Sequence, residues 1–468
     1  MRLPGFSPRS VLLVATVVGL WATPKLVFGQ NFGRGGGGGG VAVDAQGVLR
    51  VKSAADASGL LTKERVAAAR ASLNPKVATF SNLRYISLKH LEQAIIDKGG
   101  NLTEEMKNLA GLLRLHYVFF FPESKDIVIA GKAEGWGADS FGRNVGLQSG
   151  RPVIQLQDLV VALRMFPPGG QPTRLIGCSI DPTEEGLAAM QRFLRSVGSG
   201  HNVRDAQRVQ MTVVQGLKES LGLQTVTING VPPKTHFAQV MVEADYRMKL
   251  IGIGLEKPPV KLVSYVDRAS PNQIARNALV RWFFTPDYEC VRTNDDGTAM
   301  ELVGDGVKVV GEDELVGAGG QRTAVGRGNR ASQAFVTSFT KAYSELADRS
   351  PVYAELRNLI DLSVAAAYVQ QQDFYGKSGW KMELFGDEKS FTVEIYHAPK
   401  QVETAVNAVW KGQQLVTPVG GGVQIEALMA LAPEKRISDD KGKVAKLREQ
   451  TKIELPKGRW WWDAAAGK

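Results

Sequence analysis

The stretch "HFAQVMVEADYRMKLIGIGLE", residues 236–256, decides how the middle of this chain folds. A charge falls on every second residue from Glu243 to Lys249, and such alternation is typical of a strand with one charged face. The apolar residues of the stretch, however, recur every three or four positions, which is the period of a helix. Thr235 stands just before them as a helix cap, so we predict a helix. Its apolar face consists of Phe237, Val240, Met241, Ala244, Met248, Ile251 and Leu255.

This helix would hold its charges in two pairs spaced four residues apart, Glu243 with Arg247 and Asp245 with Lys249. The two pairs lie on opposite flanks of the apolar face. A helix that is apolar on two sides is expected to lie between two layers of structure, with its ion pairs at the edges of the contact. The second apolar strip consists of Val242, Tyr246 and Leu250.

One flank of the same helix is also the candidate functional site. His236, Glu243 and Arg247 lie near one another on a helical wheel. A histidine beside a carboxylate is a combination used for general acid–base catalysis. The stretch therefore has two interpretations, a structural helix held by ion pairs or part of the active site of a hydrolase.

Helices and strands alternate irregularly along the rest of the chain, which predicts an α+β fold with helices layered on a mixed or antiparallel sheet. Residues 116–131 are typical of a hairpin with a Pro-Glu-Ser-Lys turn, and residues 288–310 of a meander with two Asp-Gly turns. Later in the chain, helices are predicted at 331–350 and 351–372, and strands at 391–399 and 413–425.

The pattern divides the chain into six parts. A flexible glycine-rich N-terminus and a charged C-terminal tail flank the folded region. The predicted parts are a signal peptide at 1–29, a glycine-rich tether at 30–58, a main α+β domain at 59–316, a Gly/Arg-rich loop or linker at 317–330, a helical pair with C-terminal strands at 331–430, and a charged, tryptophan-containing tail at 431–468.

The N-terminus predicts export to the periplasm, the cell envelope or the outside of the cell. Arg2 and Arg9 precede an apolar run at 11–22, which is too short to span a bilayer, and Val27 and Gly29 occupy the positions that a signal peptidase reads. Cleavage would leave no transmembrane span. An oxidising compartment would permit one disulfide. Cys178 and Cys290 are the two cysteines of the chain, and two buried free thiols are the equal alternative.

The sequence gives no local motif for metal, nucleotide or serine-hydrolase chemistry. HExxH, GxSxG and the phosphate-binding GxxxxGK[ST] loop are missing, and five histidines are widely spread. We therefore predict no metal site and no cofactor. The net charge of +10 favours anionic partners, although the basic residues lack the clustered stripe of a nucleic-acid footprint. The candidate anion contacts are Arg322, Arg327 and Arg330, in a segment that is otherwise interpreted as a linker.

Three long phrases together resemble an uncharacterised family of exported planctomycete proteins, catalogued only as a domain of unknown function. They are "FAQVMVEADYRMKLIGIGLE", "RWFFTPDYECV" with the following "DDGTAMELVGDGVKVVGEDEL", and "FTKAYSELADRSPVYAELRNLIDLSVAAAYV". The resemblance extends from about Leu60 to the strands before Pro433. It implies export and a bacterial source, and it supplies no activity and no catalytic residue.

Export, a glycine tether, basic charge and the missing catalytic motifs favour a non-catalytic envelope or extracellular protein. Its expected partner is an anionic cell-envelope polysaccharide or another envelope protein. The alternative is a secreted hydrolase of unfamiliar type that uses carboxylates and a histidine of the central segment. The tryptophans of "RWWWD" (459–463) could stack on a sugar ring, lie at a membrane surface or pack inside the protein.

Overall fold

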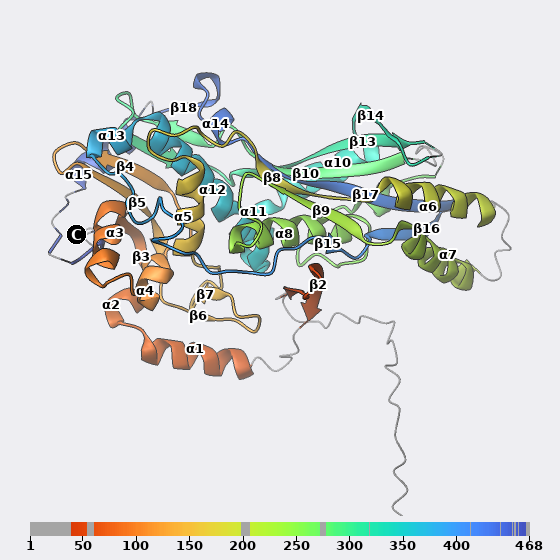
Figure 1. The fold of residues 1–468 in the computed structure, drawn as a ribbon, viewed down its shortest axis with the longest axis horizontal. Coiled ribbons are helices and arrows are strands. Elements are labelled where there is room, and N and C mark those ends of the chain that lie inside the picture. The colour runs from red at the N-terminus through yellow and green to blue at the C-terminus, as the bar shows by residue number, and fades with distance from the viewer. Residues whose placement is uncertain are drawn as a thin grey trace, which may run out of the picture. The chain divides into compact units, whose positions relative to one another are not determined.

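The computed structural model describes residues 39–464, apart from 54–59, 198–205, 272–277, 318, 412, 440, 452, 454 and 457 (Figure 1). The predicted signal peptide and the tether up to residue 38 lie outside the described residues. Within the rest of the predicted tether, β1 (Gly39–Val43) and β2 (Val48–Ser53) form an antiparallel hairpin. This part of the prediction was wrong because Val41, Val43 and Val51 pack against the core.

The larger sheet has ten strands in the described part of the chain, and it is mixed. Its order is β1-β2-β15-β9-β8-β17-β10-β13-β14, and β16 pairs with β17. The pairs β10–β17 and β2–β15 are parallel, whereas the other pairs are antiparallel. Its further strands are β8 (Ile176–Asp181), β9 (Gln224–Asn229), β10 (Ala278–Pro286), β13 (Val307–Val316), β14 (Arg322–Arg327), β15 (Gln401–Val402), β16 (Val406–Lys411) and β17 (Gln413–Ile425).

The smaller sheet has seven described strands in the order β18-β11-β12-β4-β5-β3-β19. The predicted hairpin at 116–131 is confirmed as β4 paired with β5. A separate two-stranded ribbon contains β6 (Trp136–Ala138) and β7 (Asn144–Gly146). The strands of the seven-stranded sheet are β3 (Ser81–Ser87), β4 (Tyr117–Phe121), β5 (Asp126–Ala133), β11 (Val291–Thr293), β12 (Ala299–Leu302), β18 (Ile437–Ser438) and β19 (Trp461–Asp463).

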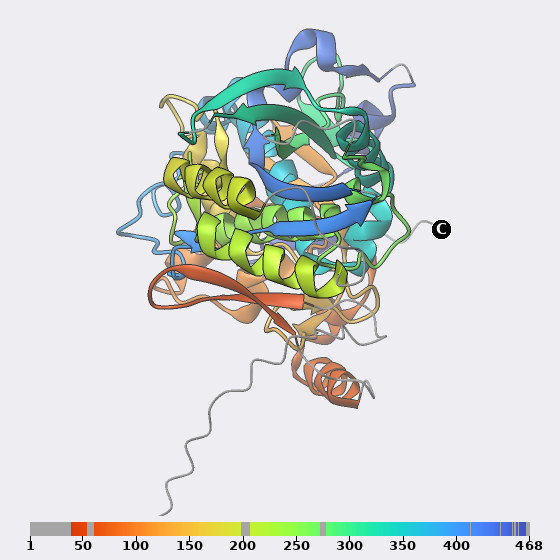
Figure 2. The same ribbon diagram turned by 90° about the vertical axis from the view of Figure 1, so that its right-hand side faces the viewer.

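Helices cover both sheets, which confirms the predicted α+β class. Figure 2 shows the yellow-green helices α6 and α7 in front of the blue strands β16 and β17, and α7 contacts β16. The longer helices are α1 (Leu60–Ser72), α3 (Leu88–Asp97), α5 (Leu156–Met165), α6 (Glu184–Val197), α7 (Ala206–Leu221), α8 (His236–Gly252), α10 (Arg330–Lys341), α11 (Tyr343–Arg349), α12 (Pro351–Gln371) and α15 (Lys443–Gln450). The shorter ones are α2 (Pro75–Ala78), α4 (Glu104–Lys107), α9 (Tyr265–Arg268), α13 (Phe374–Ser378) and α14 (Ala427–Ala430).

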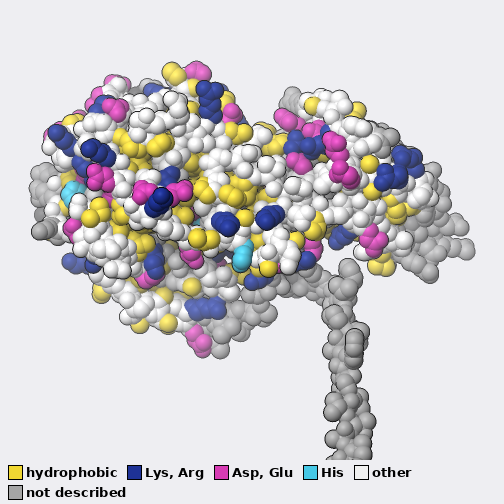
Figure 3. All heavy atoms as spheres, in the orientation of Figure 1, with side chains coloured by type: hydrophobic (Ala, Val, Ile, Leu, Met, Phe, Trp, Pro, Cys, Tyr) yellow, Lys and Arg dark blue, Asp and Glu magenta, His cyan; other side chains and the backbone are white. Residues whose placement is uncertain are grey.

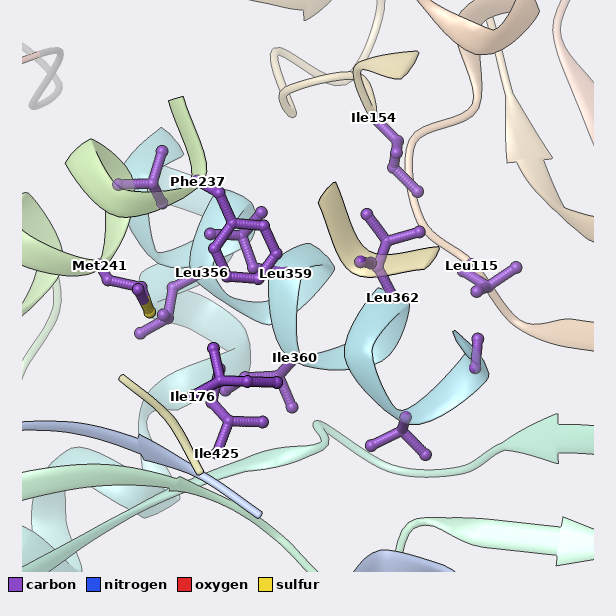
Figure 4. Close-up of a cluster of buried hydrophobic side chains, with 14 of the residues drawn as sticks. Leu115, Ile154, Ile176, Phe237, Met241, Leu356, Leu359, Ile360, Leu362 and Ile425 are labelled. Carbon is purple, nitrogen blue, oxygen red and sulfur yellow. The ribbon is translucent and has the colours of Figure 1, made fainter. Parts of the chain in front are cut away.

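Helix α8 is the predicted central helix, and the prediction of a helix rather than a strand is confirmed. The Thr235 side chain accepts a hydrogen bond from the Ala238 amide, as expected of a cap. One side of α8 contacts β8, β10 and β17, and α5 and α12 contact it as well. Figure 4 shows Phe237 and Met241 of α8 beside Leu356 of α12. The helix therefore lies between two layers, which cover both of its apolar strips apart from half-buried Leu250. The predicted Leu255 lies beyond the end of α8 and is 38% exposed, so it does not belong to the covered face.

Two segments that were predicted to be linker and tail belong to the sheets. Within 317–330, β14 pairs antiparallel with β13 at the edge of the ten-stranded sheet. Within 431–468, β19 pairs with β3, and α15 packs on the seven-stranded sheet through buried Val444. Trp460 and Trp461 are buried. Strands β14 and β19 are only six and three residues long, so their sequences do not reveal that their backbones complete a sheet edge.

Two other strand predictions were wrong. The predicted meander holds only as far as the β11–β12 hairpin, because β13 leaves that sheet and pairs with β10. Residues 391–399 do not form a strand. The Tyr396 amide instead donates to the Lys234 carbonyl. No helix in the described ranges has the length and apolar composition required to span a membrane.

Three consecutive glycines at the centre of β17 let neighbouring chains approach closely. Gly421 has φ +114°, and a Cβ there would lie 1.9 Å from the Trp282 carbonyl oxygen of β10. A Cβ on Gly422 would lie 1.8 Å from the Cys178 carbonyl oxygen of β8. β17 can therefore lie between β8 and β10 only without side chains at these positions.

We expect Gly421→Ala to lower the free energy of unfolding by about 2–5 kcal/mol, because steric overlap adds to backbone strain. Gly304→Ala is the matched control. Gly304 has φ +72° with open space around its Cβ position. Alanine there is therefore expected to cost only the strain of the left-handed backbone, about 1–2 kcal/mol of unfolding free energy. Urea unfolding followed by circular dichroism measures both variants, and equal losses would contradict the close approach.

Candidate functional site

The three predicted site residues lie on one buried flank of α8, and most of their partners come from outside this helix. The His236 Nδ1 lies 2.8 Å from Asp158 Oδ2, at the start of α5. Its Nε2 lies 4.0 Å from Glu355 Oε1, in α12. The His236 side chain is 12% exposed. His236 is therefore enclosed by two carboxylates.

Arg143, in the loop that precedes β7, connects the histidine end of the flank to Glu243. Its Nε donates to Glu355 Oε2 at 3.0 Å, and its Nη2 donates to Glu243 Oε2. Glu243 is only 2% exposed. His236 and Glu243 are linked through a chain of ion pairs, in which Glu355 lies beside His236 and Arg143 binds both Glu355 and Glu243.

The flank ends at Arg247. Its Nη1 lies 3.6 Å from Glu243 Oε1, and its Nη2 donates to Glu256 Oε1 at 2.7 Å. The predicted pair with Glu243 is therefore present, although it is longer than the bond to Glu256. Burial raises the pKa of Glu256, and Arg247 opposes this rise. Together these residues form a continuous buried ion network, defined as Asp158, His236, Glu355, Arg143, Glu243, Arg247 and Glu256.

The second predicted pair lies on the side of α8 that faces the ten-stranded sheet. Lys249 and Asp245 are fully buried, and Lys249 Nζ donates to Asp245 Oδ2 at 2.6 Å. The same ammonium donates to the carbonyl oxygens of Ile180 at 3.2 Å and Gly421 at 3.1 Å. Burial raises the pKa of Asp245 to about 6, although Lys249 opposes the rise. This pair joins the helix to β8 and β17.

The surroundings of His236 favour its charged form. Burial disfavours the imidazolium, but the charge and hydrogen bond of Asp158, with the charge of Glu355, outweigh burial and raise the pKa of His236 to about 9. At neutral pH the ring is therefore protonated and has no lone pair with which to accept a proton. In this arrangement His236 acts as a buried cation and not as a general base.

The candidate anion contacts differ from one another. Arg322 is in β14 and is paired, with Nη1 3.2 Å from Asp181 Oδ1 and Nε 3.6 Å from Glu314 Oε2. The side chain of Arg327 lies outside the described residues. Arg330 is exposed at the first turn of α10. Arg322 already has two carboxylate partners, and an anion site made of the three arginines stays a prediction.

Both cysteines are free, so the predicted option of a disulfide does not occur. Cys178 lies in β8 of the ten-stranded sheet, whereas Cys290 precedes β11 of the seven-stranded sheet. Burial raises the pKa of the Cys290 thiol to about 12 and that of Cys178 well above its ordinary value. The alternative of two buried thiols is the correct one.

Within the described ranges, no group of three or more His, Cys, Asp or Glu residues is arranged to hold a metal ion. The carboxylates of the buried network are instead occupied by Arg143, Arg247 and His236. Each of these bases is paired with at least one acid of the network.

Comparison with models of known protein families gives a match for part of the chain. Residues 178–265 match the model of a family described as "Protein of unknown function (DUF1598)". The matched range contains most of β8 and all of α6, α7, β9 and α8, and hence the Asp245–Lys249 pair. No curated protein and no solved structure matches the chain. The resemblance to a domain of unknown function is therefore confirmed for this range, whereas planctomycete origin and export stay predictions.

The sequence pointed to α8 but not to the partners of its charged residues. Glu355 and Asp361 are two of several polar residues that are buried in the largely apolar helix α12. Such polar residues are a signal of buried pairing, because a buried charge requires a partner. Arg143 lies in a glycine-rich loop with no such signal, and only the fold shows that it reaches α8.

We expect Glu243→Gln to lower the free energy of unfolding by about 3–5 kcal/mol, because it leaves buried arginines without a counter-charge. Glu345→Gln is the control, since Glu345 forms an exposed i,i+4 pair with Arg349, and such pairs contribute at most about 1 kcal/mol. Thermal and urea unfolding measure both variants. A Glu243→Gln protein as stable as the control would contradict the role of the network.

The network also predicts a pH dependence. The pKa of His236 is about 9 in the fold against an ordinary value of 6.5. Its stabilisation is therefore complete below about pH 6.5 and is lost as the pH rises through about 9, with a total of about 3 kcal/mol. Urea unfolding between pH 6 and 9.5 should show this loss, and His236→Asn should flatten the curve. Parallel curves for the two proteins would show that His236 is neutral in the fold.

Proposed function

We propose that this chain is an exported, non-catalytic protein of the bacterial envelope or extracellular space that binds an anionic polysaccharide or another envelope protein. The observation that carries the proposal is the pairing of the central acids and bases with one another. His236, Glu243 and Arg247 each bind a partner from the same network, and each is almost completely buried. Groups used in this way support the scaffold instead of a reaction.

The hydrolase alternative requires a different geometry at the same residues. A general base must lie within hydrogen-bond reach of the proton that it removes. His236 instead faces Asp158 and Glu355, and Glu243 faces Arg143. The buried position of these groups favours binding through the surface over catalysis at the centre.

The surface charge supports an anionic partner. The chain carries 57 Lys and Arg residues against 47 Asp and Glu residues, and this excess of basic charge favours contact with acidic polymers. On the face shown in Figure 3, Lys and Arg side chains lie in small groups, several of them beside acidic residues. Scattered groups suit a flexible acidic polymer more than a duplex nucleic acid, which requires a continuous basic stripe. The sequence pattern of residues 1–29 supports export.

We expect the purified chain to be retained on an immobilised anionic polysaccharide at low salt and released as salt rises. The Debye length falls from about 10 Å at 0.1 M to about 3 Å at 1 M salt, so exposed charge contacts weaken. Affinity chromatography on heparin, with neutral dextran as the control resin, measures retention. No retention on heparin would count against the proposal.

Glu243→Gln separates the two functions in the same assay. If the protein is a binder, folded Glu243→Gln should be retained as well as the natural chain, because Glu243 lies in the interior. A folded variant that had lost binding would favour a site at α8 instead.

A further inference from the structure

A surface pocket of about 520 Å³ lies where α15 packs on the seven-stranded sheet. Its volume is within the range of about 300–1,000 Å³ that is common for small-molecule sites. Residues from three parts of the chain line it, β3, the start of β4 and the C-terminal segment that carries α15. The lining residues are Asn82, Leu83, Tyr117, Lys441, Lys443, Lys446, Leu447 and Gln450.

The three lysines of this pocket are not equivalent. Lys443 Nζ donates to Glu301 Oε1 at 2.8 Å, and the Tyr117 hydroxyl donates to the same oxygen at 3.1 Å. Lys441 and Lys446 are exposed, and among the described residues no carboxylate lies within ion-pair distance of either. Two positive charges of the pocket are therefore available to a ligand.

The other lining groups fit a sugar. The ring of Tyr117 stacks on Phe119 with centroids 5.6 Å apart, so its orientation is fixed. An aromatic ring offers a flat apolar surface for the C–H face of a pyranose. The side-chain amides of Asn82 and Gln450 can donate to and accept from sugar hydroxyls. Ammonium groups beside an aromatic ring and amides form a combination that recognises a carboxylated or sulfated sugar.

We propose that this lysine pocket binds the acidic sugar units of an anionic polysaccharide, with Lys441 and Lys446 as the charge contacts. The inference rests on the proposed function, and it names the site and the ligand class. It also gives a role to the C-terminal segment, because α15 brings two of the three lysines to the sheet. Because Lys443 is paired with Glu301, we assign it a structural role in the pocket and not a role as a ligand contact.

The test uses the purified full chain and uronate oligosaccharides from alginate, with binding measured by isothermal titration calorimetry at low salt. The variant is Lys441→Ala with Lys446→Ala, which leaves the Lys443–Glu301 pair intact. The matched control is Lys98→Ala with Lys381→Ala, since both of these lysines are exposed and lie outside the pocket. Neutral dextran, duplex DNA and vesicles of anionic phospholipid serve as competing ligands.

We expect the pocket variant to bind alginate about three- to tenfold more weakly than the natural chain, since each exposed charge contact contributes up to about 1 kcal/mol. The control variant should bind as the natural chain does. Equal binding by the pocket variant and the natural chain would overturn the pocket while leaving the proposed function standing.

Two further outcomes test the ligand class. Failure of the natural chain to bind any anionic polysaccharide would contradict both this pocket assignment and the polysaccharide part of the proposed function. Binding of DNA or of vesicles in preference to alginate would overturn the sugar assignment, even if the lysine variant lost that binding.

Discussion

The fold depends on the buried ammonium group of Lys249. It donates to Asp245 within α8 and to the carbonyl oxygens of Ile180 in β8 and Gly421 in β17. The β8–β17 ladder ends at the pair Ser179–Gly422. The two residues just beyond this pair, Ile180 in β8 and Gly421 in β17, accept hydrogen bonds from Lys249 through their carbonyl oxygens. Burying an ammonium costs several kcal/mol unless it is paired and fully hydrogen-bonded. The charge is therefore tolerated only where helix and both strands meet in this one arrangement.

The glycines of β17 make that arrangement possible. Gly421 turns its backbone through a positive φ beside Trp282, and its carbonyl reaches Lys249. A Cβ on the preceding Gly420 would lie 2.5 Å from Asp181 Oδ1. Its absence lets Asp181 of β8 reach Arg281 of β10 across the strand between them, at 3.0 Å. Sheet order, helix position and ion pairing therefore depend on the same three residues.

The buried network on the other flank of α8 has a different consequence. It connects α5, α8 and α12 with the loop of Arg143 and leaves the acids and bases of the centre occupied. Removing one partner of a buried ion pair is strongly destabilising because the other charge is left uncompensated, so the network holds these helices in one arrangement. Function is then expected at the surface, where the lysine pocket beside α15 has unpaired charge.

The sequence by itself determined the α+β class, the α8 helix with its Thr235 cap, and its place between two layers, because local periodicity and capping report which faces are apolar. It also singled out Glu243 and Arg247. Only the tertiary structure decided that β14 and β19 complete sheet edges, that Cys178 and Cys290 lie in different sheets, and which partners the charges have. Arg143 reaches Glu243 over a separation of 100 residues, and such contacts depend on chain topology. Sequence periodicity shows which faces of a segment are apolar, whereas only the tertiary structure determines which residues pack against each face.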